Sequence, residues 1–161
     1  MTDFSALIPS LVNESVEFII VGGAAATAHG SARLTEDLDI VYRRTKKNIA
    51  RLVQTLAPHH PYLRGAPPGL PFAWDESTVL RGLNFTLTTS LGAIDLLGEI
   101  AGGGNYENLL PDTERIQLFG VKCLCLNLER LIQTKRAAGR PKDFETIAEL
   151  ETILEQRRRS Q

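Results

Sequence analysis

The sequence has 161 residues, and its 18 lysines and arginines nearly balance its 19 aspartates and glutamates, for a formal net charge of -1. Hydrophobic residues make up 43% and charged residues 23%, which excludes a disordered, collagen-like or disulfide-rich chain. The length fits one domain. The near-zero net charge argues against a protein that coats nucleic acid through bulk electrostatics, although a local basic patch is compatible with it.

The cysteines and the longest apolar runs indicate the compartment. Cys123 and Cys125 are two residues apart, a spacing on a strand that suits neither a disulfide nor, without other ligands, a zinc site. The apolar runs are too short to span a membrane, and the first residues lack the basic start of a signal peptide. We therefore expect a cytoplasmic protein without a membrane partner, in which both thiols are buried.

Hydrophobic periodicity predicts alternating helices and strands in the first part of the chain. In chain order we expect a helix at 4–16, a buried strand at 17–23 that ends in two glycines, a short helix at 24–29, a polar loop at 31–36, a strand at 37–42 and a helix at 45–56. Thr45 is the expected N-cap of the last of these helices.

The remainder begins with the proline-rich stretch 58–71, which we expect to be an irregular flap or rim. After it we expect a hairpin of strands 83–88 and 93–97 around a turn at 89–92, a flexible loop at 101–105, one or two strands within 115–126, and helices at 128–138 and 142–156. The predicted fold is α/β. A small mixed sheet flanked by helices occupies residues 1–126, and a helical segment, residues 127–161, packs on it within a single domain.

The strand at 37–42 carries the first chemical signal. Asp37 and Asp39 stand at i and i+2, so both side chains leave one face, about 6.5 Å apart along the strand. Leu38, Ile40 and Tyr42 take the opposite face. The two carboxylates repel each other unless they are solvated or bridged by a cation, and Mg²⁺ prefers such oxygen ligands. A solvated strand edge is the structural alternative.

Two further features extend this signal. Gly22 and Gly23 separate the first strand from the helix that follows, and glycine lets the backbone approach a phosphate closely. Asp95 lies in the middle of a strand among apolar neighbours, where a carboxylate is costly without a metal or a cationic partner. Together these residues predict a site for a nucleoside triphosphate and one or two Mg²⁺ (or Mn²⁺) ions.

The segment from Val21 to Ile40 resembles the signature of the DNA polymerase β-like nucleotidyltransferase superfamily. That signature is a Gly-Gly or Gly-Ser pair, a gap of about ten residues, and then Asp-x-Asp, with a later aspartate on a strand. Residues 17–155 resemble the small bacterial nucleotidyltransferases related to the AbiEii-type toxins and the minimal nucleotidyltransferases. Residues 128–135 and 139–143 resemble that group as well, where a lysine and a later Lys-Asp are typical.

The resemblance implies transfer of a nucleoside monophosphate from an NTP to an acceptor. Asp37 and Asp39 would bind Mg²⁺, and Asp95 would complete the metal site or deprotonate the acceptor hydroxyl. Gly22 and Gly23 would contact the triphosphate. The remaining residues expected near the phosphates are basic or hydroxyl-bearing, each of them also compatible with an ordinary surface role: Arg33, Thr35, Lys135 and Lys142.

Other residues are expected to be structural. Asp143 stands where it can cap a helix, His29 stands at a helix end where the dipole favours it, and Trp74 is expected to pack on its own loop. The basic run 157–159 is expected to be a solvated tail, with contact to RNA phosphates as the alternative.

The acceptor stays open at this point. The resembled group includes enzymes that act on a tRNA end, a protein or a small molecule, and many of them belong to toxin–antitoxin modules. The short chain favours a catalytic core completed by a toxin or antitoxin partner or by a second copy in a homodimer. Two alternatives remain: a non-catalytic partner protein with the same fold that binds a toxin, and a nucleotide-sugar glycosyltransferase, for which the chain is short.

Overall fold

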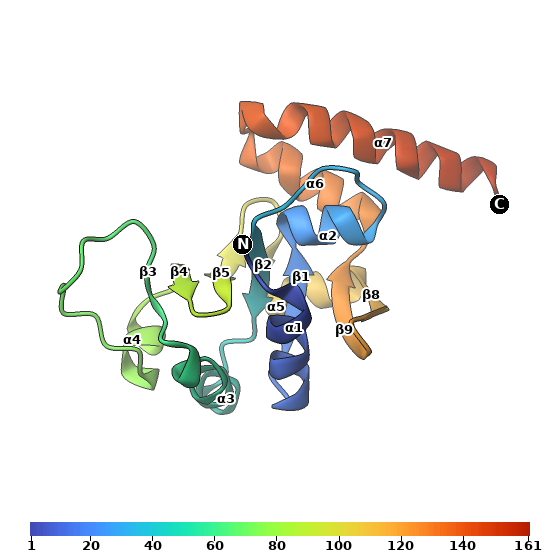
Figure 1. Cartoon of the computed structure of the whole chain (residues 1–161). Helices are drawn as coiled ribbons and strands as arrows, with labels where there is room; N and C mark the ends of the chain where they lie inside the picture. Colours follow the sequence, from blue (N-terminus) through green and yellow to red (C-terminus); the bar gives the residue numbers. More distant parts are fainter.

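The computed structural model describes all 161 residues and has an α/β architecture, a seven-stranded mixed sheet with helices around it (Figure 1). The strand order is β3-β4-β5-β2-β1-β9-β8. The strands are β1 (Phe18–Val21), β2 (Asp37–Tyr42), β3 (Tyr62–Leu63), β4 (Phe85–Thr89), β5 (Gly92–Leu97), β8 (Thr113–Leu118) and β9 (Val121–Leu126), with β6 (Glu99–Ile100) and β7 (Gly104–Asn105) forming a separate pair.

Parallel and antiparallel pairs alternate across the centre of the sheet. β2 pairs with β1 antiparallel and with β5 parallel, and β1 pairs with β9 parallel. On β2 the residues Leu38, Ile40 and Tyr42 are fully buried, in agreement with the apolar face expected from the alternation. The other face of β2 carries Asp37 and Asp39.

The helices are α1 (Phe4–Asn13), α2 (Gly22–Ala28), α3 (Lys46–Leu56), α4 (Glu76–Arg81), α5 (Tyr106–Leu109), α6 (Leu128–Ala138) and α7 (Phe144–Arg159). Helices α6 and α7 pack on each other, and α6 packs on α2, at one side of the molecule, at the top of Figure 1, while α1 and α3 lie at the opposite side. The C-terminal helices thereby form a wall beside the ends of the central strands. None of the helices combines the length and hydrophobicity needed to cross a membrane.

Local sequence patterns predict many element boundaries well. The strand at 37–42 and the helix at 128–138 have the expected bounds, and the Thr45 side chain accepts a hydrogen bond from the backbone N–H of Asn48, as expected for an N-cap. The hairpin is confirmed, with a tighter turn because Thr89 and Gly92 belong to the strands.

Several boundaries differ from the prediction. The first helix ends at Asn13, before the expected end at residue 16, and the last helix runs from Phe144 to Arg159. The loop expected at 101–105 contains β7, and the helices α4 and α5 were not expected. Both helices are too short to produce a periodic hydrophobic pattern in the sequence. Each begins at a residue whose side chain caps it, Asp75 for α4 and Asn105 for α5.

The proline-rich segment is less irregular than predicted. It contains a 3-10 turn at Ala57–His59 and the edge strand β3, and then projects from the rest of the molecule, at the left of Figure 1. Tyr62 stabilises the projection, since its ring meets Phe72 edge-on at 6.1 Å and its hydroxyl donates to Pro67 O. Trp74 packs on α3 rather than on its own loop and donates Nε1–H to Val53 O at 3.0 Å.

Asn48 joins three parts of the core. Its Oδ1 accepts from the backbone N–H of Glu17 at 2.6 Å, and its Nδ2 donates to Glu17 O at 2.9 Å and to Arg43 O at 2.8 Å. The side chain is buried, so water cannot take its place as the hydrogen-bond partner of these backbone groups, which lie at the start of β1 and the end of β2.

We expect Asn48→Ala to lower the free energy of unfolding by about 3 kcal/mol, because it leaves buried backbone groups without partners. Urea denaturation measures the change, with Asn13→Ala, at an exposed position at the end of α1, as the control. Equal stability of the two variants would contradict this role for Asn48.

Candidate metal centre

Two neighbouring strands carry the acidic residues that the sequence singles out. Asp39 on β2 lies opposite Asp95 in the parallel pairing with β5, and opposite Val21 in the antiparallel pairing with β1. Asp37 precedes Asp39 by two residues, so its side chain leaves the same face of the sheet. The register of the sheet therefore brings the three carboxyl groups together beside the end of β1.

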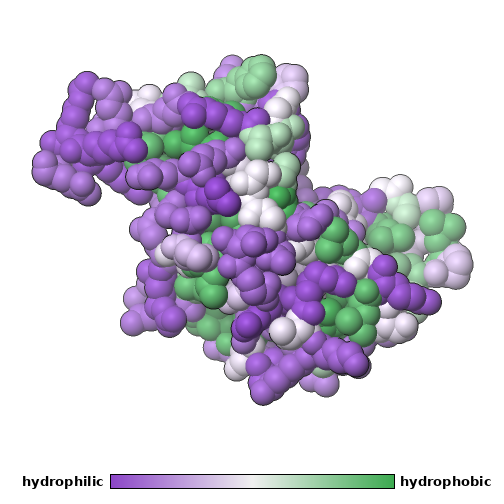
Figure 2. Space-filling model, turned by 180° about the vertical axis from the view of Figure 1, so that it is seen from behind, coloured by the Kyte–Doolittle hydropathy of each residue, from purple (hydrophilic) through white to green (hydrophobic).

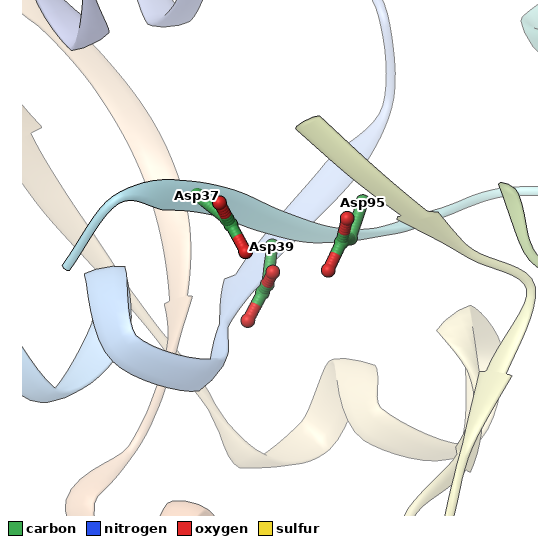
Figure 3. A group of neighbouring side chains, drawn as sticks. All are labelled: Asp37, Asp39 and Asp95. Atoms are coloured by element: carbon green, nitrogen blue, oxygen red, sulfur yellow. The ribbon is translucent and has the colours of Figure 1, made fainter. Parts of the chain in front are cut away.

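The three side chains point in a common direction (Figure 3). Oxygen atoms of Asp37, Asp39 and Asp95 all lie within 4.8 Å of one another, close enough to bind one divalent ion. The side chain of Asp37 is 41% exposed and that of Asp95 is 23% exposed. The cluster thus opens to solvent at Asp37 and becomes more enclosed toward β5.

Asp39 has the most perturbed electrostatics in the cluster. Burial, followed by the charges of Asp95 and Asp37, raises the pKa of Asp39 from 3.8 to about 7, and Lys135 opposes the rise. Asp39 Oδ1 is buried and accepts no hydrogen bond, and Asp95 Oδ1 is buried and meets only the Arg64 guanidinium, in an ion pair without a hydrogen bond. A buried carboxylate oxygen without a donor, as in Asp39, is costly, and a cation would satisfy it, so the cluster fits a divalent metal ion.

The glycine pair fits closely against the acidic cluster. Gly22 begins α2 with φ +62°, and a Cβ atom at this position would lie 2.1 Å from Asp39 Oδ2. A Cβ atom at Gly23 would lie 2.6 Å from Thr35 Oγ1. A side chain at either position would therefore force Asp39 or Thr35 to shift, and at Gly22 the positive φ adds backbone strain.

Arg64 is a residue of the site that sequence reasoning missed. It follows β3, and its Nη2 lies 2.8 Å from Asp95 Oδ1 in a geometry that makes no hydrogen bond, while its Nη1 donates to Asp37 Oδ2 at 3.4 Å. The same Nη2 donates to Leu87 O at 2.7 Å. A single arginine in a proline-rich stretch carries no periodic signal, so only strand pairing could reveal this contact.

The C-terminal helices contribute a buried cation. The side chain of Lys135 on α6 is only 8% exposed, and its Nζ lies 3.5 Å from Asp143 Oδ1. Asp143 also accepts from Arg140 Nε at 2.7 Å. It makes no capping hydrogen bond to α7, so the capping role expected for it is wrong. Asp143 instead holds two cationic side chains at the edge of the cluster.

Two hollows meet at the acidic cluster, and both are lined by Asp39, Asp95, Lys135 and Arg140. The larger, of about 600 Å³, has mostly polar walls and is called the polar hollow below; its further lining residues include Gly23, Arg33, Thr35, Asp37 and Lys142. The smaller, of about 280 Å³, has a more apolar wall that includes Val21, Leu97, Ile100 and Leu131. The carboxylates thus stand between a polar and a partly apolar space.

The residues predicted to lie near the phosphates differ in whether their side chains already have partners within the chain. Lys142 is exposed and makes no ion pair. Arg33 lines the polar hollow but donates to Glu145 at 2.7 Å and lies 3.9 Å from Glu149. Thr35 donates to Asp37 O at 3.2 Å, so its hydroxyl shapes the loop before β2. Of these side chains, Lys142 is the one available to an anion without rearrangement.

Other residues that the sequence left as structural are buried or paired. Cys123 and Cys125 are buried free thiols, and burial raises the pKa of both. His29 Nε2 lies 2.7 Å from Leu126 O, and Arg157 donates to His29 O at 3.0 Å. The basic run at the end of α7 is helical and paired within the chain, and this end of the helix forms a hydrophilic projection (Figure 2, upper left).

A scan of the chain against protein-family models found no match, and a search of curated proteins found no significant match. The chemistry of the centre is therefore the basis for assigning a function.

We expect Asp39→Asn to stabilise the metal-free protein at pH 8 and to do so much less at pH 5. The pKa of Asp39 rises from 3.8 to about 7 in the fold, so the folded protein retains a proton that the unfolded chain releases. The contribution of this group to the free energy of unfolding therefore falls as the pH rises from about 4 to 7. Above pH 7 the carboxylate is charged in both states, and the folded protein bears the full destabilisation of burying that charge. In EDTA at pH 8 we expect a melting temperature about 5 °C higher than wild type.

Glu36→Gln is the control for this comparison, because it neutralises an exposed carboxylate at the same hollow. An equal gain for Asp39→Asn at both pH values would show that burial of the charge is not the cause.

Gly22→Ala is expected to lower stability by about 2 kcal/mol and to weaken Mn²⁺ binding, since the new methyl group displaces Asp39. Gly65→Ala is the matched control: Gly65 also has positive φ, +80°, but no atom lies within 4 Å of its Cβ position. It should cost about 1 kcal/mol, from backbone strain alone, and leave metal binding intact. Denaturation and Mn²⁺ titration of both variants make the comparison, and equal Mn²⁺ affinities would refute the steric argument.

Proposed function

We propose that this protein is a Mg²⁺-dependent nucleotidyltransferase, which transfers a nucleoside monophosphate from an NTP to a hydroxyl acceptor. The observation that carries the proposal is the convergence of Asp37, Asp39 and Asp95 within 4.8 Å, beside the tightly packed turn at Gly22 and Gly23. The resemblance of the segment 21–40 to the polymerase β-like signature supports the same assignment.

The three carboxylates would hold the metal, and Asp39 Oδ1, which is buried without a hydrogen-bond donor, is the oxygen that a bound ion would stabilise most. A bound Mg²⁺ would neutralise charge on the phosphates of the NTP. The polar hollow would receive the triphosphate, because Lys135, Arg140 and Lys142 line it next to the carboxylates. Asp143 would keep Lys135 and Arg140 in place through its two ion pairs.

The reaction needs the acceptor oxygen in line with the bond that breaks. A new bond forms between the acceptor oxygen and the α-phosphorus, the bond to the bridging oxygen of the β-phosphate breaks, and pyrophosphate leaves. The acceptor proton passes to a carboxylate, and Asp95 is within the cluster that faces both hollows. The chain's own contribution is mainly positioning and charge compensation, which suffices for much of the barrier in phosphoryl transfer.

The smaller hollow suits an organic group rather than a phosphate. Its wall carries apolar side chains such as Leu97 and Leu131, which the polar hollow largely lacks. We propose that the acceptor, or the nucleoside half of the NTP, enters here. The acceptor itself would be the end of an RNA, a protein side chain or a small molecule.

A second candidate function is a non-catalytic protein of the same fold that binds a partner toxin. One observation favours it: Arg64 already lies against Asp37 and Asp95, so the acidic cluster has a counter-ion without any metal. Metal binding and nucleotide transfer separate the two candidates.

Incubation with each α-³²P-labelled NTP, Mg²⁺ and a cell extract tests the enzymatic proposal. We expect label in RNA, protein or a small molecule, and we expect Asp37→Asn to reduce the transfer by about a hundredfold or more. Asp112→Asn is the matched control. Its side chain is 42% exposed against 41% for Asp37, and it too pairs with an arginine at 3.4 Å. No transfer from any NTP, or equal transfer by Asp37→Asn and wild type, would favour the non-catalytic candidate.

A further inference from the structure

Arg64 contacts two of the three carboxylates of the acidic cluster that we propose as a metal site. Its guanidinium contacts Asp37 Oδ2 at 3.4 Å and Asp95 Oδ1 at 2.8 Å, so it bridges two of the three carboxylates through their oxygens. Its backbone N–H donates to Thr86 O at 3.0 Å, and its Nη2 donates to Leu87 O, so β4 anchors the residue. The bridge is therefore held in place from the neighbouring strand.

The bridge leaves several polar atoms unsatisfied. Arg64 Nε is buried without an acceptor, Asp39 Oδ1 is buried without a donor, and the contact of Arg64 with Asp95 Oδ1 is an ion pair that makes no hydrogen bond. A guanidinium carries one positive charge spread over a plane, whereas a divalent ion concentrates two charges on the carboxylate oxygens. Arg64 thus compensates the cluster only in part, and a stronger cation can replace it.

Space for a displaced Arg64 lies on the phosphate side. Arg64 lines a further hollow of about 510 Å³, which shares Leu34, Thr35, Glu36 and Asp37 with the polar hollow. The guanidinium could turn into this space while its backbone stays paired with β4. There it would be near the position expected for the triphosphate, whose oxygens are good bidentate partners for arginine.

We propose that Arg64 is an internal counter-ion that competes with the metal, so that the metal binds tightly only together with a polyphosphate. The metal displaces Arg64 from Asp37 and Asp95, and the phosphates then accept the displaced guanidinium. This inference rests on the proposed function, and it adds a positioning residue that couples metal binding to nucleotide binding. Without a polyphosphate, the positive charge of Arg64 opposes the entry of the ion.

Binding of Mn²⁺ to the full chain, followed by electron paramagnetic resonance of the free ion, tests the competition. We expect Arg64→Gln to bind Mn²⁺ about tenfold more tightly than wild type in the absence of nucleotide, because the competing charge is gone. Arg64→Lys keeps the charge and should have an affinity between the two. Arg115→Gln is the control for the loss of a positive charge far from the cluster: Arg115 is exposed, makes no ion pair and lies on β8 at the opposite edge of the sheet, so this variant should match wild type.

Thermal denaturation measures the coupling between metal binding and polyphosphate binding. Wild type should gain little stability from Mn²⁺ alone, and clearly more from excess Mn²⁺ with inorganic tripolyphosphate. Arg64→Gln should gain most of its stability from Mn²⁺ alone. The melting curves without ligand also show whether each variant is folded.

The outcomes separate this inference from the proposed function. Clear Mn²⁺ binding with equal affinity in wild type and Arg64→Gln, or weaker binding in the variant, would overturn the competition and leave the metal site standing. Absence of Mn²⁺ binding in every variant, with and without tripolyphosphate, would overturn both.

Discussion

Repulsion among three carboxylates at the centre of the sheet is the constraint to which the surrounding structure responds. The register that sets Asp39 opposite Asp95 places carboxyl oxygens within 4.8 Å of one another in a partly buried site. The burial and the neighbouring charges raise the pKa of Asp39 to about 7, which means that the fold holds this group at an energetic cost. Such a cost is typical of functional sites, where local stability is sacrificed for chemistry.

Two cationic side chains compensate this charge, and a close backbone contact encloses it. Arg64 reaches the cluster from the edge strand β3, and Lys135 reaches it from α6, where Asp143 holds it. Gly22 packs its backbone against Asp39 so closely that no side chain would fit. The C-terminal helices therefore complete the electrostatics of the sheet, in addition to covering it.

The distribution of charge explains why the net value is uninformative. A formal net charge of -1 conceals acidic residues on the central strands and basic residues on the C-terminal helices and the edge of the sheet. Folding brings members of both groups to the lining of the polar hollow. A lining that carries both charges suits a ligand that itself carries both a cation and an anion, which a metal-bound polyphosphate does.

Local sequence patterns determine the elements that depend on periodicity and capping. The alternation in 37–42 predicts both the strand and the shared face of its two aspartates, and the Gly22-Gly23 pair predicts the change from strand to helix. Tertiary structure decides which residues from other strands and helices join them. Asp95 stands out in the sequence as a carboxylate among apolar neighbours, but only the pairing of β2 with β5 makes it a neighbour of Asp39. Arg64 and the ion pair of Lys135 with Asp143 depend on contacts between distant segments, for which a single sequence has no local period.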